Sequence, residues 1–343
     1  MTIAERLAQY AHSLRYQTLP PAVIHEVKRR VLDSIACAYG AWSAEPCRIA
    51  RRMASASQLR EGATLWGTRL RTTPDLAAFA NGALVRYLDF NDTYLAQEPA
   101  HPSDNIAAVV ALGEAAHASG RRVIQAIAVA YELQCRLCDA AALRPKGWDH
   151  VTYGPFSSAL GAAVVLRLSR AATVQAINLA INLAGVANIA LRQTRVGDLS
   201  MWKACAFSNA ARNGVFAARL AQLGMTGPAP IFEGEKGFMK LVSGPLALPH
   251  LGGEQPNDEV PFKILDTYIK HYPVEYHAQT AVEAALLVRE ELLKDEGPDI
   301  DGVLKAIRKI EIGSYDVAIE IIGRDPEKWR PRTRETADHS FPY

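Results

Sequence analysis

The sequence predicts a mainly α-helical protein, with a large all-helical domain over residues 1–270 and a smaller α+β domain over residues 271–343. Apolar residues recur at helical spacing through the first 270 residues. Near residue 300 the pattern changes to alternating apolar and polar residues, which is typical of half-buried strands. The chain has 343 residues, and single cores usually stop growing at roughly 250 to 300 residues, so two domains are expected.

The predicted helices follow one another along the first domain. The first contains Ile3, Leu7, Tyr10 and Leu14, and the second begins after Pro20-Pro21, because proline is tolerated in a first helical turn. Ala-rich apolar segments follow at 75–88, 105–118, 123–138, 156–168, 172–191 and 199–223. Since these segments hold many Ala and Gly residues but few alternating Val and Ile residues, they predict closely packed helices.

The second domain is expected to mix one helix with strands. Residues 280–294 predict an amphipathic helix, and residues 310–312 and 317–321 predict two strands. The Gly- and Pro-rich segments 226–230 and 244–261 are expected to be surface loops.

Composition excludes several classes of function. The 38 Lys and Arg residues nearly balance the 36 Asp and Glu residues, so no global basic field would attract nucleic acid or anionic lipid. The N-terminus carries no signal-peptide pattern, and the most apolar stretch, 176–191, is too short to span a bilayer. Five scattered cysteines, an odd number, favour a reduced cytoplasmic setting over a disulfide framework. We therefore expect a cytoplasmic protein without nucleic-acid or membrane partners.

The first candidate site lies at the end of the predicted helix 75–88. Asp89, Asp92, Thr93 and His101 fall within a short segment, so an acid, a base and a hydroxyl can converge there. An acidic helix end followed by a turn built on His-Pro-Ser-Asp would explain the same residues without chemistry.

Three further segments offer candidates. His150 precedes an apolar helix, although a histidine in that place is often a cap. Lys203 would head a small apolar stripe of helix 199–221, either snorkelling from its end or held in a pocket by an anion. Residues 270–279 lie at the predicted domain junction, where ligand clefts are common, and could equally form a polar linker.

Metal and cofactor sites are not expected. Cys135 and Cys138 have a metal-like spacing, but a second ligand pair is missing, so two buried core residues are the better interpretation. The sequence also lacks a phosphate-binding glycine loop and the H-E-x-x-H motif.

Several strings, taken together, resemble the MmgE/PrpD family, and most closely its MmgE branch. They are YLDFNDTYLAQEPAHPSDN (87–105), KGWDHVTYG (146–154), LRQTRVGDLSMWKACAFSNAARNGVFAA (191–218), TGPAPIFEGEKGF (226–238), YIKHYPVEYHAQTAVEAAL (268–286) and TRETADHSFPY (333–343). The matches run in the family's order and cover essentially the whole chain, so the resemblance is not coincidental.

The resemblance implies a helical domain and a smaller α+β lid domain with the active site between them, in a homodimer. It implies catalytic roles for Asp89, His101, His150, Lys203 and Lys270, and substrate contacts from Thr93, Glu275, His277 and His339. Family members continue beyond the position of Tyr343, so the lid domain is expected to be incomplete. A catalytically impaired, truncated paralogue, or a chain that acts only as an oligomeric partner, therefore stays as an alternative.

The reaction that the resemblance implies is dehydration of 2-methylcitrate to 2-methylaconitate in propionate catabolism, with citrate or isocitrate as further substrates. Such an elimination needs cations to meet the charge that builds on a carboxylate, which Lys203 and Lys270 could supply, with Arg192 and Arg195 as carboxylate clamps. We assign His101 as base and His150 as its partner, although the reverse is open. Decarboxylation of cis-aconitate and epimerisation of a dicarboxylate begin from a similar carbanion and stay as alternatives.

Overall fold

The computed structural model describes residues 1–184, 197–255, 259–296 and 299–343. These residues form two compact units. Unit 1 comprises the described residues between 1 and 184 and between 201 and 269, and unit 2 comprises those between 197 and 200 and between 270 and 343. The prediction of a mainly α-helical protein is confirmed.

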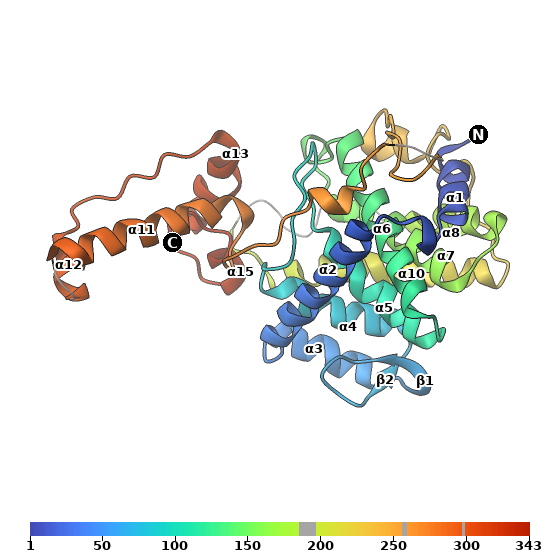
Figure 1. The fold of residues 1–343 in the computed structure, drawn as a ribbon, viewed down its shortest axis with the longest axis horizontal. Helices are drawn as coiled ribbons and strands as arrows, with labels where there is room; N and C mark the ends of the chain where they lie inside the picture. The colour runs from blue at the N-terminus through green and yellow to red at the C-terminus, as the bar shows by residue number, and fades with distance from the viewer. Residues whose placement is uncertain (185–196, 256–258, 297–298) are drawn as a thin grey trace. The chain divides into compact units, whose positions relative to one another are not determined.

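Unit 1 is a bundle of helices (Figure 1). The helices are α1 (Ile3–Ser13), α2 (Pro21–Gly40), α3 (Glu45–Ser55), α4 (Pro74–Tyr87), α5 (Ile106–Ala115), α6 (Gly120–Ala140), α7 (Gly154–Leu166), α8 (Arg170–Ala184) and α10 (Ala206–Gln222). Local chemistry explains several starts. Thr2 and Glu5 cap α1 reciprocally, Pro21 and Pro74 occupy first turns, and the Ser119 side chain caps α6.

Helix α7 lies at the centre of this bundle, with residues 154–165 all buried. It packs against α6, α8 and α10. Small residues allow this close packing, because a Cβ atom on Gly214 of α10 would lie 2.8 Å from Ala159 N and Pro155 O of α7. The Ala and Gly content that predicted closely packed helices therefore has a direct structural cause.

Unit 1 also contains a small antiparallel hairpin that the sequence pattern did not predict. Its strands are β1 (Gln58–Thr64) and β2 (Arg71–Thr72). A Cβ atom on Gly62 would lie 2.2 Å from the carbonyl oxygen of Thr72, so the strands can approach only because residue 62 is glycine. Helix α3 was likewise not predicted.

Short turns carry the loops between the helices. They include η2 (Pro102–Asn105), η3 (Arg144–Lys146), η4 (His150–Tyr153), η5 (Met201–Ala204) and η7 (Lys263–Asp266). The prediction of one helix over 199–223 is wrong in its first turn, because Lys203 lies in η5 and α10 begins at Ala206. Lys203 is therefore not part of the small apolar stripe of α10.

Unit 2 is helical over much of its length. It contains η8 (Tyr276–Ala278), α11 (Gln279–Glu296), α12 (Ile300–Ala306), α13 (Asp316–Ala318), the π-helical turn η9 (Ile319–Gly323), α14 (Pro326–Trp329) and α15 (Arg334–Ala337). The two strands predicted at 310–312 and 317–321 are wrong, since no strand occurs among the described residues of unit 2. Ala318 and Ile322 are both buried and lie four residues apart, which is helical spacing.

No helix within the described ranges combines the length and the apolar character that crossing a membrane requires. Cys135 and Cys138 are buried in α6, and burial raises the pKa of both thiols well above the ordinary value. They belong to the helix core, as the sequence indicated.

Candidate active site

The candidate site begins where α4 ends. Asp89 follows the last turn of this helix and has a φ of 50°, a left-handed conformation that costs a non-glycine residue about 1 to 2 kcal/mol. The Arg86 guanidinium holds it there, because Nη1 donates a hydrogen bond of 2.5 Å to Asp89 Oδ1. Both side chains are buried. Strain retained at a buried carboxylate is typical of functional sites.

Lys203 approaches the same carboxylate from η5. Its Nζ lies 3.3 Å from Asp89 Oδ2, and the side chain is only 3% exposed. The snorkelling interpretation of Lys203 is therefore wrong. Asp89 lies between two buried cations, Arg86 and Lys203. These three side chains together carry a net positive charge.

His101 is held in one orientation beside Asp89. Its Nδ1 lies 2.7 Å from the carbonyl oxygen of Asp92, which can only accept, so Nδ1 carries a proton. Thr93 Oγ1 lies 3.2 Å from the same nitrogen. In the neutral imidazole the lone pair is therefore on Nε2, which lies 4.0 Å from Asp89 Oδ1. His101 has the tautomer that a base requires.

His150 meets His101 edge to face, with ring centroids 5.5 Å apart. The side chain of Asp149 caps the turn η4, which begins at His150, and its Oδ1 lies 3.5 Å from His150 Nε2. On its other side the imidazole stacks on Phe207 of α10, at 6.4 Å. Unit 1 thus brings together Asp89, Thr93, His101, His150 and Lys203, five of the residues that the sequence singled out.

Behind these residues lies a second buried carboxylate, Asp104. Arg86 Nε lies 3.9 Å from its Oδ2, and Asn91 donates a 2.8 Å hydrogen bond to its Oδ1. Burial raises the pKa of Asp104 to about 7, with Asp92 and Asp89 adding to the effect while Arg86 opposes it. Arg86 therefore connects the two carboxylates.

Asp92 serves as an anchor in this loop. Its Oδ1 accepts a 2.9 Å hydrogen bond from Ser103 N, and its Oδ2 accepts one of 2.9 Å from the Tyr131 hydroxyl. Arg30 Nε lies 3.8 Å from Oδ2. Burial raises the pKa of Asp92, although Arg30 opposes this. The side chain thus fixes the loop whose carbonyl oxygen orients His101.

Sequence reasoning missed Arg86 and Asp104, and weak signals for both were present. Arg86 stands three residues before Asp89 at a helix end, a spacing at which side chains meet. Asp104 belongs to the His-Pro-Ser-Asp string that follows His101.

The candidates of unit 2 form a group of their own. Glu275 Oε2 accepts a 2.6 Å hydrogen bond from His277 N, and His277 Nδ1 lies 2.5 Å from the Tyr315 hydroxyl. Glu275 N donates to the carbonyl oxygen of Asp338, whose side chain lies 3.1 Å from His339 Nδ1. Glu275, His277 and the segment of His339 are therefore adjacent.

Lys270, Arg192 and Arg195 are the other residues that the sequence predicted for the site. Lys270 is buried and begins the longer segment of unit 2, residues 270–343. Arg192 and Arg195 lie outside the described residues.

Comparison with known proteins gives consistent matches. The model of the MmgE/PrpD N-terminal domain matches residues 5–249, and that of the C-terminal domain matches residues 272–343. A 2-methylcitrate dehydratase of Escherichia coli K12 is 30% identical over 333 residues, which cover 91% of this chain and 64% of the relative. A 2-methylcitrate dehydratase of Cupriavidus necator is 28% identical over 347 residues, 96% of this chain and 67% of the relative.

A third relative is named for a different reaction, a decarboxylation. The human cis-aconitate decarboxylase is 28% identical over 310 residues, which cover 86% of this chain and 61% of the relative. The chain thus spans about 64% of the length of the Escherichia coli relative that it matches.

Proposed function

The chain belongs to the MmgE/PrpD family, and from that premise we propose that it is a hydro-lyase that converts 2-methylcitrate to 2-methylaconitate. One observation carries the proposal. His101 presents a basic Nε2 atom beside a buried carboxylate, and that carboxylate also contacts Lys203.

The elimination sets clear requirements. A C–H bond next to a carboxylate breaks, its electron pair forms the new double bond, and the hydroxyl on the adjacent carbon leaves as water after receiving a proton. Negative charge builds on the carboxylate beside the reacting carbon. The protein must therefore supply a base, an acid and a positive charge.

His101 is the proposed base. Because Nδ1–H donates to the Asp92 carbonyl oxygen, Nε2 is the atom that accepts the substrate's proton. The Asp89 carboxylate, 4.0 Å from Nε2, then stabilises the imidazolium that forms. Arg86 and Lys203 both contact the Asp89 carboxylate and favour its ionised form. Asp89 therefore stabilises the positive charge on His101 and does not take the proton itself.

Lys203 is the proposed electrostatic partner of the substrate. A lysine held in a buried place by Asp89 is desolvated in advance, so its charge acts strongly on a nearby anion. On the strength of the family resemblance, Lys270 is proposed as a second catalytic cation, and Thr93, Glu275, His277 and His339 as substrate contacts. Arg192 and Arg195 are proposed as carboxylate clamps because guanidinium groups pair with carboxylates.

His150 is the proposed acid for the departing hydroxyl. Its ring lies 5.5 Å from that of His101, so the two imidazoles can serve adjacent carbons of one substrate. The opposite assignment makes a different prediction for the pH profile. If His101 is the base, H101N removes the acidic limb of kcat/KM, and if His150 is the base, H150N does so.

Decarboxylation of cis-aconitate is the second candidate, supported by the relative of that name. In that reaction carbon dioxide leaves and the carbon receives a proton, so the same base, acid and lysine would serve. Product analysis separates the two, because dehydration conserves every carbon of the substrate whereas decarboxylation releases one.

The test supplies the purified chain with 2-methylcitrate, citrate, isocitrate and cis-aconitate in separate reactions, each with a chelator. We predict a conjugated product from 2-methylcitrate, unchanged by chelation, because the proposed chemistry needs no metal ion. K203M should reduce turnover at least a hundredfold, while K236M, at an exposed lysine, should retain it. Product from cis-aconitate alone, or full turnover by K203M, would reject the proposal.

We also propose that the enzyme is a cytoplasmic homodimer that acts in propionate catabolism. Light scattering at several concentrations tests the dimer, and a constant monomer mass would contradict it.

A further inference from the structure

Unit 1 contains a cationic cavity that shares no residue with the candidate active site. It has a volume of about 310 Å³ and lies where the end of α1, the start of α6 and the turn between α7 and α8 meet. Its polar lining consists of His12, Arg15, Arg122, Arg167 and Thr173. The volume falls within the range of small-ligand sites.

The titratable side chains of the lining are all basic. It contains three arginines and one histidine but no aspartate or glutamate. Among the described residues, Arg122 and Arg167 have no carboxylate within ion-pair distance. Burial lowers the pKa of Arg122, and the charges of Arg167 and Arg15 lower it further. The arginines therefore repel one another, and no carboxylate of the described residues pairs with Arg122 or Arg167 to offset this repulsion.

The backbone holds these arginines in place. Arg15 donates to the carbonyl oxygens of His12 and Leu14 at the end of α1. Arg167 ends α7 in a left-handed conformation, with a φ of 54°, and its N–H donates to Val164 O. Arg122 lies in the first turn of α6, next to the Ser119 cap. The cluster is therefore built into three helix ends.

The position of Arg122 adds a second unfavourable term. A helix N-terminus carries a partial positive charge and favours acidic residues in its first turn. The first turn of α6 contains no acidic residue and places Arg122 there instead. An anion in the cavity would relieve both the repulsion between the arginines and the conflict with the helix dipole.

We propose that this cavity binds a small multivalent oxyanion, either a phosphate-type anion or a polycarboxylate, through Arg15, Arg122 and Arg167. Guanidinium groups suit such ligands, because their paired N–H donors match the spacing of two oxygens in a phosphate or carboxylate group. Thr173 offers a hydroxyl at the same cavity.

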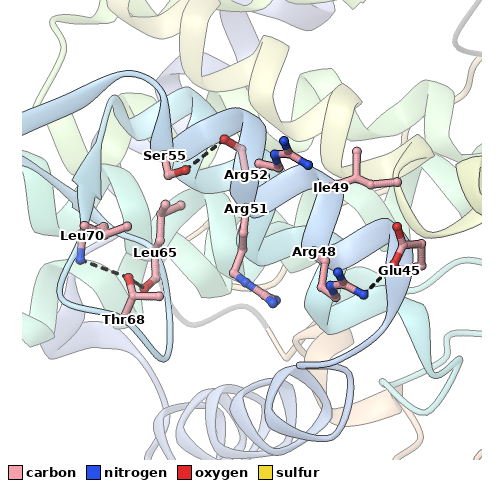
Figure 2. A pocket seen from close by; sticks show the side chains of 9 residues that line it. All are labelled: Glu45, Arg48, Ile49, Arg51, Arg52, Ser55, Leu65, Thr68 and Leu70. Carbon is pink, nitrogen blue, oxygen red and sulfur yellow. Dashed lines mark hydrogen bonds and ion pairs between the residues drawn. The ribbon is translucent and has the colours of Figure 1, made fainter.

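A second arginine-lined pocket of unit 1 differs because its lining includes a carboxylate. It has a volume of about 370 Å³ and is lined by Arg48, Arg51 and Arg52 of α3. Arg48 Nη1 lies 2.9 Å from Glu45 Oε2, and a dashed line marks this ion pair in Figure 2. Arg51 lies over the Trp42 ring, 3.7 Å from its centroid. This pocket serves as the comparison because its lining includes a carboxylate, Glu45, which pairs with one of the three arginines.

Isothermal calorimetry on the full chain tests the proposal, with inorganic phosphate and citrate as the probes at constant ionic strength. Citrate is titrated in the K203M background, so that binding at the candidate active site is weakened. We expect saturable binding of at least one probe, weakened at least tenfold in R122Q and further in R122Q/R167Q. The probe that binds identifies the source of the anion.

Two controls match the variant. R121Q changes the neighbouring residue, which lies over the Tyr16 ring and does not line the cavity, and R48Q changes the comparison pocket. Both should bind as the parent does. Removing repulsion should leave the melting temperature of ligand-free R122Q unchanged or higher, which excludes misfolding as the cause of lost binding. Binding by R122Q equal to that of the parent, or no saturable binding of either probe, would overturn the proposal.

Discussion

The pH dependence of stability in the Asp104→Asn variant follows from the geometry around Arg86. Asp104 is buried, and its burial raises the pKa to about 7 from the ordinary value of 3.8. A folded-state pKa above the unfolded value means that the group stabilises the fold fully below pH 3.8 and that this contribution is lost as the pH rises through 7. The folded and unfolded pKa values of Asp104 differ by about 3 units. Each unit is equivalent to roughly 1.4 kcal/mol, so the stability lost amounts to about 4 kcal/mol.

Asparagine has nearly the same shape and does not titrate, so the variant lacks this dependence. Arg86 keeps its hydrogen bond of 2.5 Å to Asp89, which preserves the rest of the cluster. The free energy of unfolding of the wild type, minus that of the variant, should therefore fall by about 4 kcal/mol between pH 4 and pH 8.

The assay is urea unfolding at a series of pH values, followed by tryptophan fluorescence. Asp266→Asn, at an exposed aspartate of unit 1, is the control and should give a difference that is nearly constant. A constant difference for Asp104→Asn as well would refute the reasoning, since it would mean that Asp104 titrates as an exposed carboxyl does.

Three further predictions concern packing and polar contacts. Glu132→Gln should lower the free energy of unfolding by about 3 kcal/mol, because buried Glu132 accepts hydrogen bonds from Gly252 N, Lys263 N and Arg136; an unchanged urea midpoint would contradict this. Gly214→Ala should lower the free energy of unfolding by about 2 kcal/mol, because the added Cβ atom would clash with the backbone of α7. Gly120→Ala should be nearly neutral, because no atom lies within 4 Å of its Cβ position. Equal melting temperatures for the two variants would contradict this prediction. Thr93→Val should lower kcat/KM about tenfold through the lost contact with His101, and unaltered kinetics would exclude that role.

Helices of the bundle were predictable because their signal is local. Apolar spacing, the proline starts and the high content of Ala and Gly together indicate α4, α6 and α7. The strand predicted at 317–321 is wrong because a short apolar run fits strand spacing and helical spacing equally well. Ile322 adds an apolar residue four positions after Ala318. The burial of both residues, visible only in the structure, distinguishes the helix from the strand.

Part of the candidate site was predictable and part was not. Asp89, Thr93 and His101 lie close together in the sequence, so their meeting needed only a short loop. The contact of Lys203 with Asp89 joins residues far apart in the chain. The family resemblance implied that both belong to the active site, but neither it nor the spacing predicted that they touch. The roles of Arg86 and Asp104 depend on burial, which raises the pKa of Asp104 and which a sequence pattern does not reveal.

The rate of water elimination by His101→Asn tests the central claim most directly. That claim is that Nε2 of His101, fixed by the Asp92 carbonyl oxygen and facing Asp89, removes the carbon-bound proton. We predict that kcat on 2-methylcitrate falls at least a hundredfold in this variant, while His25→Asn, at an exposed histidine, keeps the wild-type rate. A kcat for His101→Asn within about threefold of the wild-type value would show that another group takes the proton.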